Sequence, residues 1–152
     1  MLNDALLAWF HHIAAFGLVA VLVVEMAICK PGLDARQMKI LNRYDLLYGI
    51  FAGLLLIAGF MRMYLGAKGA AFYWSNPMFH TKLTFFILMG LLSIPPTFRY
   101  IHWRRAFAQD PNFTPTDAEI KRTRLFLHIQ ATLLLFIPLL GALMARGVGI
   151  RG

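Results

Sequence analysis

Residues 5–29 read ALLAWFHHIAAFGLVAVLVVEMAIC, an apolar stretch that contains a single acidic residue, Glu25. An α-helix needs about 20 such residues to cross the hydrocarbon core of a bilayer. Three more apolar stretches follow at about 46–64, 77–98 and 125–145. The four stretches fill most of the 152 residues, so the sequence predicts one all-α transmembrane domain over residues 1–152, an integral membrane four-helix bundle.

The composition argues against a water-soluble globule and restricts the available metal ligands. Hydrophobic residues make up 59% of the chain and charged residues 14%, with a mean hydropathy of +0.63, which is too apolar for a soluble domain. The net charge of +8 comes from basic residues in the connections and at segment ends, where they set topology, so we expect no nucleic-acid partner. Cys29 is the only cysteine, which excludes an internal disulfide and a cysteine-held zinc or iron–sulfur cluster.

Turn and cap residues indicate where the helices begin and end. Pro31-Gly32 ends the first segment, and Asp34 and Asn76-Pro77 each provide an N-cap for the following helix. A further N-cap signature at Thr114-Pro115 predicts that the fourth segment begins as a helical turn outside the membrane. Pro95-Pro96 lies in the last turn of the third segment and predicts a kink or an early end there.

The distribution of lysine and arginine predicts the orientation in the membrane. One side of the predicted bundle holds ten basic residues and the opposite side holds five. By the positive-inside rule, the ten lie in the cytoplasm and both termini, Met1 and Gly152, lie outside it. The ten are Lys30, Arg36, Lys39, Arg43, Arg99, Arg104, Arg105, Lys121, Arg122 and Arg124, and the five are Arg62, Lys68, Lys82, Arg146 and Arg151.

Ionisable side chains within the apolar segments are costly and are therefore the candidate functional residues. In this orientation, the outer half of the membrane contains His11, His12, Arg62, His80 and Lys82. Histidine is a usual axial ligand of haem iron, and arginine or lysine can pair with haem propionates. The alternative is that these side chains only snorkel to the interface and anchor the helix ends.

The inner half contains a second group of polar residues. A second haem between His102 and His128 is disfavoured, because His102 lies in a basic, aromatic run that is typical of an interfacial anchor. Glu25 lies on nearly the same helix face as His11, which leaves a proton path open. We expect instead that Glu25 pairs with a cation of the inner loop.

Small and polar residues indicate how the helices pack. Gln130 is expected to hydrogen-bond between helices, and Gly49 and Gly53 form a GxxxG pair that allows close helix approach. These features support a competing interpretation, in which the protein is a non-enzymatic assembly factor or an oligomeric scaffold without haem. The histidines are then interfacial.

Three stretches resemble a family of small bacterial four-helix membrane proteins of unassigned function. They are WFHHIAAF at residues 9–16, NPMFHTKL at residues 76–83 and MARG at residues 144–147. This resemblance covers nearly the whole chain and implies a multi-pass protein of the bacterial inner membrane.

More distantly, the His-Ile of the first segment and the His-Thr-Lys-Leu that opens the third resemble the membrane-embedded, haem-b-associated protoporphyrinogen oxidase of bacteria. The essential histidine and lysine of that family would fall on His12 and Lys82. The sequence departs from the pattern at Leu92 and Ser93, where a further histidine is expected, and it lacks the Asn-Glu-Pro-like start of the fourth segment. These departures weaken the transfer of oxidase activity more than the transfer of haem binding.

Taken with the outer histidines, this resemblance implies a haem-b-binding redox protein, an oxidase or an electron carrier. His12 is the preferred axial ligand and His11 or His80 the next candidate. Lys82 would be the catalytic cation, and it would share with Arg62 the supply of positive charge to propionates or to an anionic substrate. A quinol or a porphyrinogen would be the hydrophobic partner, with the lipid bilayer around the protein and a homo-oligomer as a further expectation.

Overall fold

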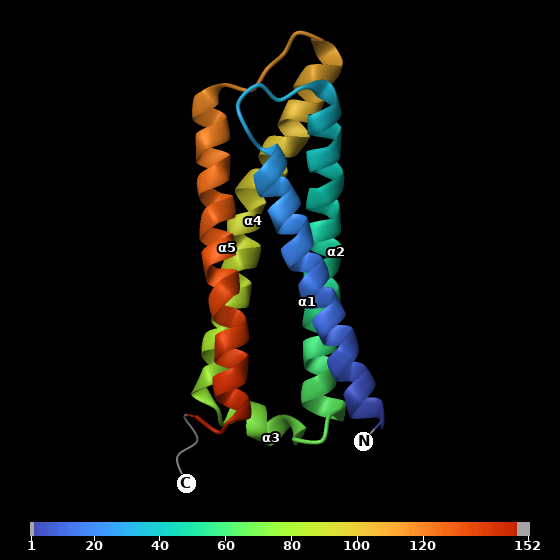
Figure 1. The fold of residues 1–152 in the computed structure, drawn as a ribbon, viewed down its shortest axis with the longest axis vertical. Helices are drawn as coiled ribbons and strands as arrows, with labels where there is room; N and C mark the ends of the chain where they lie inside the picture. Colours follow the sequence, from blue (N-terminus) through green and yellow to red (C-terminus); the bar gives the residue numbers. More distant parts are fainter. Residues whose placement is uncertain (1, 149–152) are drawn as a thin grey trace.

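The computed structural model describes residues 2–148, which form five α-helices and no strand (Figure 1). Four of the helices are long and apolar enough to cross a membrane, which confirms the predicted all-α fold class. The fifth, α3, is a short helix between the second and third of these. The helices are α1 (Leu2–Ile28), α2 (Ala35–Leu65), α3 (Gly69–Trp74), α4 (Pro77–Gln109) and α5 (Asp117–Ala145).

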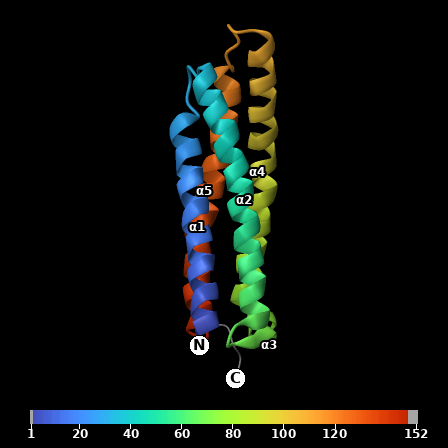
Figure 2. The same cartoon turned by 90° about the vertical axis from the view of Figure 1, so that its right-hand side faces the viewer.

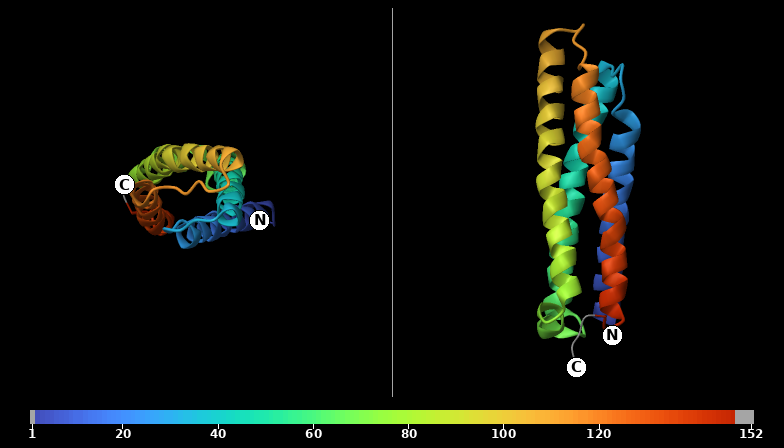
Figure 3. Two further views of the ribbon diagram at one scale, coloured as in Figure 1. Left: turned by 90° about the horizontal axis from the view of Figure 1, so that it is seen from above. Right: turned by 90° about the vertical axis from the view of Figure 1, so that its left-hand side faces the viewer.

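The four long helices form an antiparallel ring in the order α1, α2, α4, α5 (Figure 3). The start of α1, the end of α5 and α3 lie together at one end, which we call the terminal end (Figures 1 and 2). The connections at residues 29–34 and 110–116 lie at the opposite end, the loop end. Met1 and Gly152 are outside the described residues, and the side of the membrane that each end faces stays a prediction.

Two of the predicted helix starts are confirmed. The Asp34 carboxylate accepts a hydrogen bond of 2.7 Å from the backbone N–H of Gln37, whose own side chain accepts one of 3.0 Å from the backbone of Asp34. The Asn76 side chain accepts a hydrogen bond of 2.8 Å from the backbone of Met78, with Pro77 in the first turn. Both caps satisfy backbone donors that a helix start leaves without partners.

The predicted start of the fourth membrane helix is wrong by two residues. The N-cap of α5 is Thr116 and not Thr114. Glu119 lies three residues after Thr116, so the two side chains form a reciprocal capping box that satisfies two backbone N–H groups. At 1.5 Å per residue, the 29 residues of α5 span about 43 Å, so its charged first two turns extend beyond the hydrocarbon at the loop end.

The predicted early end of the helix at Pro95-Pro96 is wrong, because α4 continues through both prolines to Gln109. Proline has no N–H, so Pro96 leaves the carbonyl of Leu92 without its helical donor. The side-chain amide of Gln130 on α5 donates to that carbonyl at 3.2 Å. A neighbouring helix can satisfy backbone groups that proline frees within a membrane, so α4 does not end there. This contact also confirms Gln130 as a helix-to-helix hydrogen bonder.

Close approach between α1 and α2 occurs at Gly17 and not at the predicted GxxxG pair. A Cβ atom on Gly17 would collide with the ring of Phe51 on α2. By contrast, Gly49 and Gly53 are exposed, and a Cβ at either position would meet nothing within 4 Å. The pair therefore does not pack helices together within this chain.

Candidate functional site

A cavity of about 690 Å³ lies at the terminal end between all four long helices, with residues of the α3 region on its rim. Its deeper wall is apolar and includes Leu55, Phe86 and Leu134, whereas its ionisable residues lie nearer the helix ends. The volume is within the range of small-molecule and cofactor sites. The acidic, basic and histidine residues that line it are Asp4, His11, His12, Arg62, Lys68 and Lys82.

Two histidines of α1 face this cavity in different ways. The Nδ1–H of His12 donates a hydrogen bond of 2.6 Å to the carbonyl of Ala8, so the neutral ring has a free lone pair on Nε2. The half-buried ring of His11 lies against Gly59 of α2, and its Nδ1 has no hydrogen-bond partner among residues 2–148. Successive helix residues point about 100° apart, so the two rings cannot bind opposite faces of one metal ion.

Positive charge collects at the cavity without matching negative charge. Arg62 and Lys82 are half-buried there, and the Nε atom of Arg62 is buried without a hydrogen-bond partner in the described part of the chain. Neither residue is in an ion pair, because residues 2–148 contain only the pair Arg99–Glu119 at the loop end. Asp4 is the only acidic residue among the described residues that line the cavity. The arrangement therefore favours an anionic ligand with a large apolar part.

The structure does not bring His80 to this cavity, although it lies at the same end of the bundle. The Nε2–H of His80 donates a hydrogen bond of 2.9 Å to the carbonyl of Trp74, the last residue of α3. The two rings also lie next to each other at an angle of 40°, with centroids 5.9 Å apart. His80 thus holds α3 against the start of α4, and it does not line the cavity that His11, His12 and Lys82 line.

Lys68 and Asp4 are cavity residues that the sequence did not single out. Lys68 is the N-cap residue of α3, and its Nζ lies 4.3 Å from the centroid of the Phe72 ring. The Asp4 carboxylate accepts a hydrogen bond of 3.4 Å from the backbone of Ala67. The aromatic-rich connection that contains Lys68 could have indicated these residues, because a segment that closes the end of a bundle lies beside any cavity at that end.

A second polar group lies in the core of the loop half and corrects the expectation for Glu25. This side chain is only 2% exposed, it is in no ion pair, and its Oε1 has no hydrogen-bond partner among the described residues. Nearby, the Asp45 carboxylate accepts a hydrogen bond of 2.7 Å from Thr97. The predicted pairing of Glu25 with a loop cation is therefore wrong.

The histidines and acidic residues do not form a multi-ligand metal centre in the described part of the chain. No group of three or more His, Cys, Asp or Glu side chains there is placed to hold a metal ion. A haem needs only one or two protein ligands to its iron, so the predicted roles of the histidines stay predictions.

Comparison with known proteins identifies a family. The model of a family described as "Predicted membrane protein (DUF2214)" matches residues 3–149. No curated protein and no solved structure matches the chain. These findings support the resemblance to a membrane-protein family of unassigned function and give no support to the resemblance to protoporphyrinogen oxidase.

Proposed function

The chain belongs to this family of predicted membrane proteins, and on that premise we propose that it binds haem b in the terminal-end cavity and acts in electron transfer. The observation that carries the proposal is the gathering of two histidines and three cations around one largely apolar cavity, with none of the three cations in an ion pair within residues 2–148. Haem has the same two parts, an apolar ring system and two anionic propionates.

His12 is the proposed axial ligand. Its hydrogen bond to Ala8 fixes the ring and leaves Nε2 available, as second-shell partners do for other metal-binding histidines. Arg62 and Lys82 would neutralise the propionates, and the side chain of His11 would lie beside the ring system. When bound, haem would supply one-electron redox chemistry.

The partner in this proposal is a hydrophobic reductant, a quinol or a porphyrinogen, that reaches the protein through the bilayer. Lys82 is the cation proposed to attract an anionic substrate, because it is partly buried and is in no ion pair with any residue that the structure describes. The resemblance to small bacterial membrane proteins also leads us to propose the bacterial inner membrane as the location.

The test is the visible spectrum of protein purified in mild detergent from haem-replete cells. We expect a Soret band with reducible α and β bands, which His12→Ala abolishes. His80→Ala is the matched control, because it removes the same residue type at the same end of the bundle but outside the cavity lining. Wild-type protein without a Soret band refutes haem binding, whereas loss of the spectrum only in His80→Ala refutes the choice of ligand.

A second candidate is a non-enzymatic scaffold or assembly factor that forms a homo-oligomer. The observation that favours it is the outward exposure of Gly49 and Gly53 on α2, which leaves a GxxxG pair without a partner helix in the described chain. Light scattering of the detergent-solubilised protein tests it. A haem-free oligomer that Gly53→Leu converts to a monomer supports the scaffold, and a haem-free monomer refutes both functions.

A further inference from the structure

The loop end contains a separate, smaller cavity of about 360 Å³ between α4 and α5. Phe98, Arg99 and His102 of α4 line it together with Arg122 and Phe126 of α5. Phe98 and Phe126 each lie about one helical turn deeper in the bundle than His102 and Arg122, respectively. The cavity therefore has an apolar inner part and a cationic outer part.

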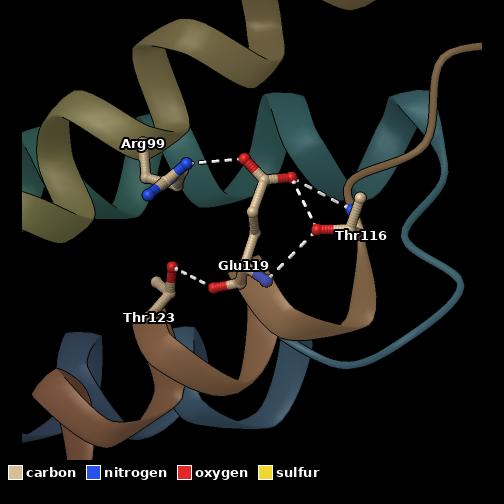
Figure 4. A network of polar contacts seen from close by, with 4 residues as sticks. All are labelled: Arg99, Thr116, Glu119 and Thr123. Carbon is tan, nitrogen blue, oxygen red and sulfur yellow. Dashed lines mark hydrogen bonds and ion pairs between the residues drawn. The ribbon is translucent and has the colours of Figure 1, made fainter.

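A polar network between α4 and α5 fixes one wall of this cavity (Figure 4). Arg99 forms an ion pair with Glu119, whose carboxylate also accepts hydrogen bonds of 3.1 and 3.0 Å from the backbone and hydroxyl of Thr116. The positive charge of Arg99 thus already neutralises the negative charge of Glu119. The helices are held at a defined separation beside the cavity.

Two polar side chains of the cavity have no polar partner in the described part of the chain. Arg122 and His102 are exposed, and neither is in an ion pair or a side-chain hydrogen bond within residues 2–148. Arginine is well suited to phosphate, because its planar guanidinium can donate two parallel hydrogen bonds to the phosphate oxygens. The outer part of the cavity thus has the chemistry of a phosphate site.

We propose that this cavity binds the headgroup phosphate of an anionic phospholipid such as phosphatidylglycerol. Basic pockets between transmembrane helices near the membrane surface commonly take anionic headgroups. The apolar inner part favours a lipid over free phosphate: Phe98 is 68% exposed at membrane depth, where it can contact an acyl chain. The site lies at the end opposite the proposed haem cavity and does not depend on it.

The experiment compares lipid retention by purified full-length protein in a neutral detergent, measured by native mass spectrometry. We expect retention of phosphatidylglycerol over phosphatidylcholine. Arg122→Gln should weaken phosphatidylglycerol binding about fivefold, since a basic residue near the membrane surface contributes roughly 1 kcal/mol. Arg104→Gln is the matched control, because Arg104 is an exposed cation of α4 outside the cavity lining.

Three outcomes would overturn the proposal. The first is equal retention of the two lipids by the wild type, and the second is a loss of binding in Arg104→Gln as large as that in Arg122→Gln. The third is that inorganic phosphate at millimolar concentration displaces the lipid completely, which would make the cavity a site for the free anion. Circular dichroism of each variant confirms that its helix content is unchanged before binding is compared.

Discussion

Arg124 of α5 donates a hydrogen bond of 2.7 Å from its Nη1 atom to the backbone carbonyl of Cys29, the residue that follows α1. The same Nη1 lies 3.1 Å from the carbonyl of Met26. The last carbonyls of a helix have no donor within the helix, so Arg124 satisfies the end of α1 from a helix at the other end of the chain. In the sequence, Arg124 contributes only to the prediction of topology, whereas in the structure it links the first and last helices.

We expect Arg124→Met to lower the free energy of unfolding by about 1–3 kcal/mol, the usual loss when a charged hydrogen-bond donor is removed from partly buried acceptors. Thermal unfolding in detergent measures the change. Arg104→Met is the control, since Arg104 is exposed and makes no ion pair in the described residues. Equal effects of the two substitutions would show that the contact with Cys29 contributes nothing.

Gln130→Leu should destabilise the bundle by roughly 0.6–2 kcal/mol, the range for hydrogen bonds between membrane helices. Pro96 has no N–H to donate to the backbone carbonyl of Leu92, so without the Gln130 amide that carbonyl loses its donor. Thr132→Val on the same helix is the control, because the Thr132 hydroxyl bonds only to His128 within α5. A stability of Gln130→Leu that matches Thr132→Val would contradict this explanation of how α4 continues through its prolines.

Glu25→Gln should leave the protein as stable as the wild type at neutral pH, or more stable. Burying a charged carboxylate costs desolvation free energy, and Glu25 has no ion-pair partner among the described residues to offset that cost. The comparison variant is Glu119→Gln, which removes a carboxylate that is paired with Arg99 and should lower stability. If Glu25→Gln is the more damaging of the two in denaturant unfolding, Glu25 has a charged partner in the membrane.

The Glu119 network also predicts a pH dependence. Glu119 precedes the apolar part of α5. Partial burial alone would raise the pKa of its carboxyl group. The hydrogen bonds from Thr116 and the charge of Arg99 outweigh that effect and bring the pKa below its ordinary value of 4.5. The folded state therefore binds this proton less readily than the unfolded state, and the stabilisation is complete above pH 4.5 and declines as the pH falls below it. The stability difference between wild type and Glu119→Gln should shrink between about pH 5 and pH 3. A difference that is constant with pH would exclude the carboxylate as its origin.

If haem binds at the terminal end, Lys82→Met should lower haem retention or shift the midpoint potential downward, because loss of a nearby cation disfavours the reduced, more negative site. Spectroscopic redox titration measures the potential. Lys39→Met, an exposed cation at the loop end, is the control. Unchanged haem content and potential in Lys82→Met would leave Lys82 as an interfacial anchor.

The sequence predicts the elements of this fold well where the cause is local. Four long apolar stretches predict four membrane helices, and Asp34 and Asn76 mark helix starts because their caps involve residues within three positions. The end of α4 could not be predicted in this way. Its continuation past Pro96 depends on Gln130, which a window around the prolines does not contain.

The candidate site shows the same division. Position along the chain gives the depth of a residue in the membrane, so His11, His12, His80, Arg62 and Lys82 were correctly placed at one end. Depth does not give the direction in which a side chain points relative to the other helices. His80 therefore shares the end but not the cavity, because α3 folds back to accept its hydrogen bond.

The connection at residues 66–76, which contains the short helix α3, joins two helical hairpins, α1 with α2 and α4 with α5. Each hairpin makes its most extensive contacts internally. Membrane helices insert before they associate. Each hairpin can therefore complete its own packing before the two meet, and the terminal-end cavity comes into existence only when they dock. Lys68 and Tyr73 of the segment that joins the hairpins line that cavity, so this segment also borders the space that docking creates.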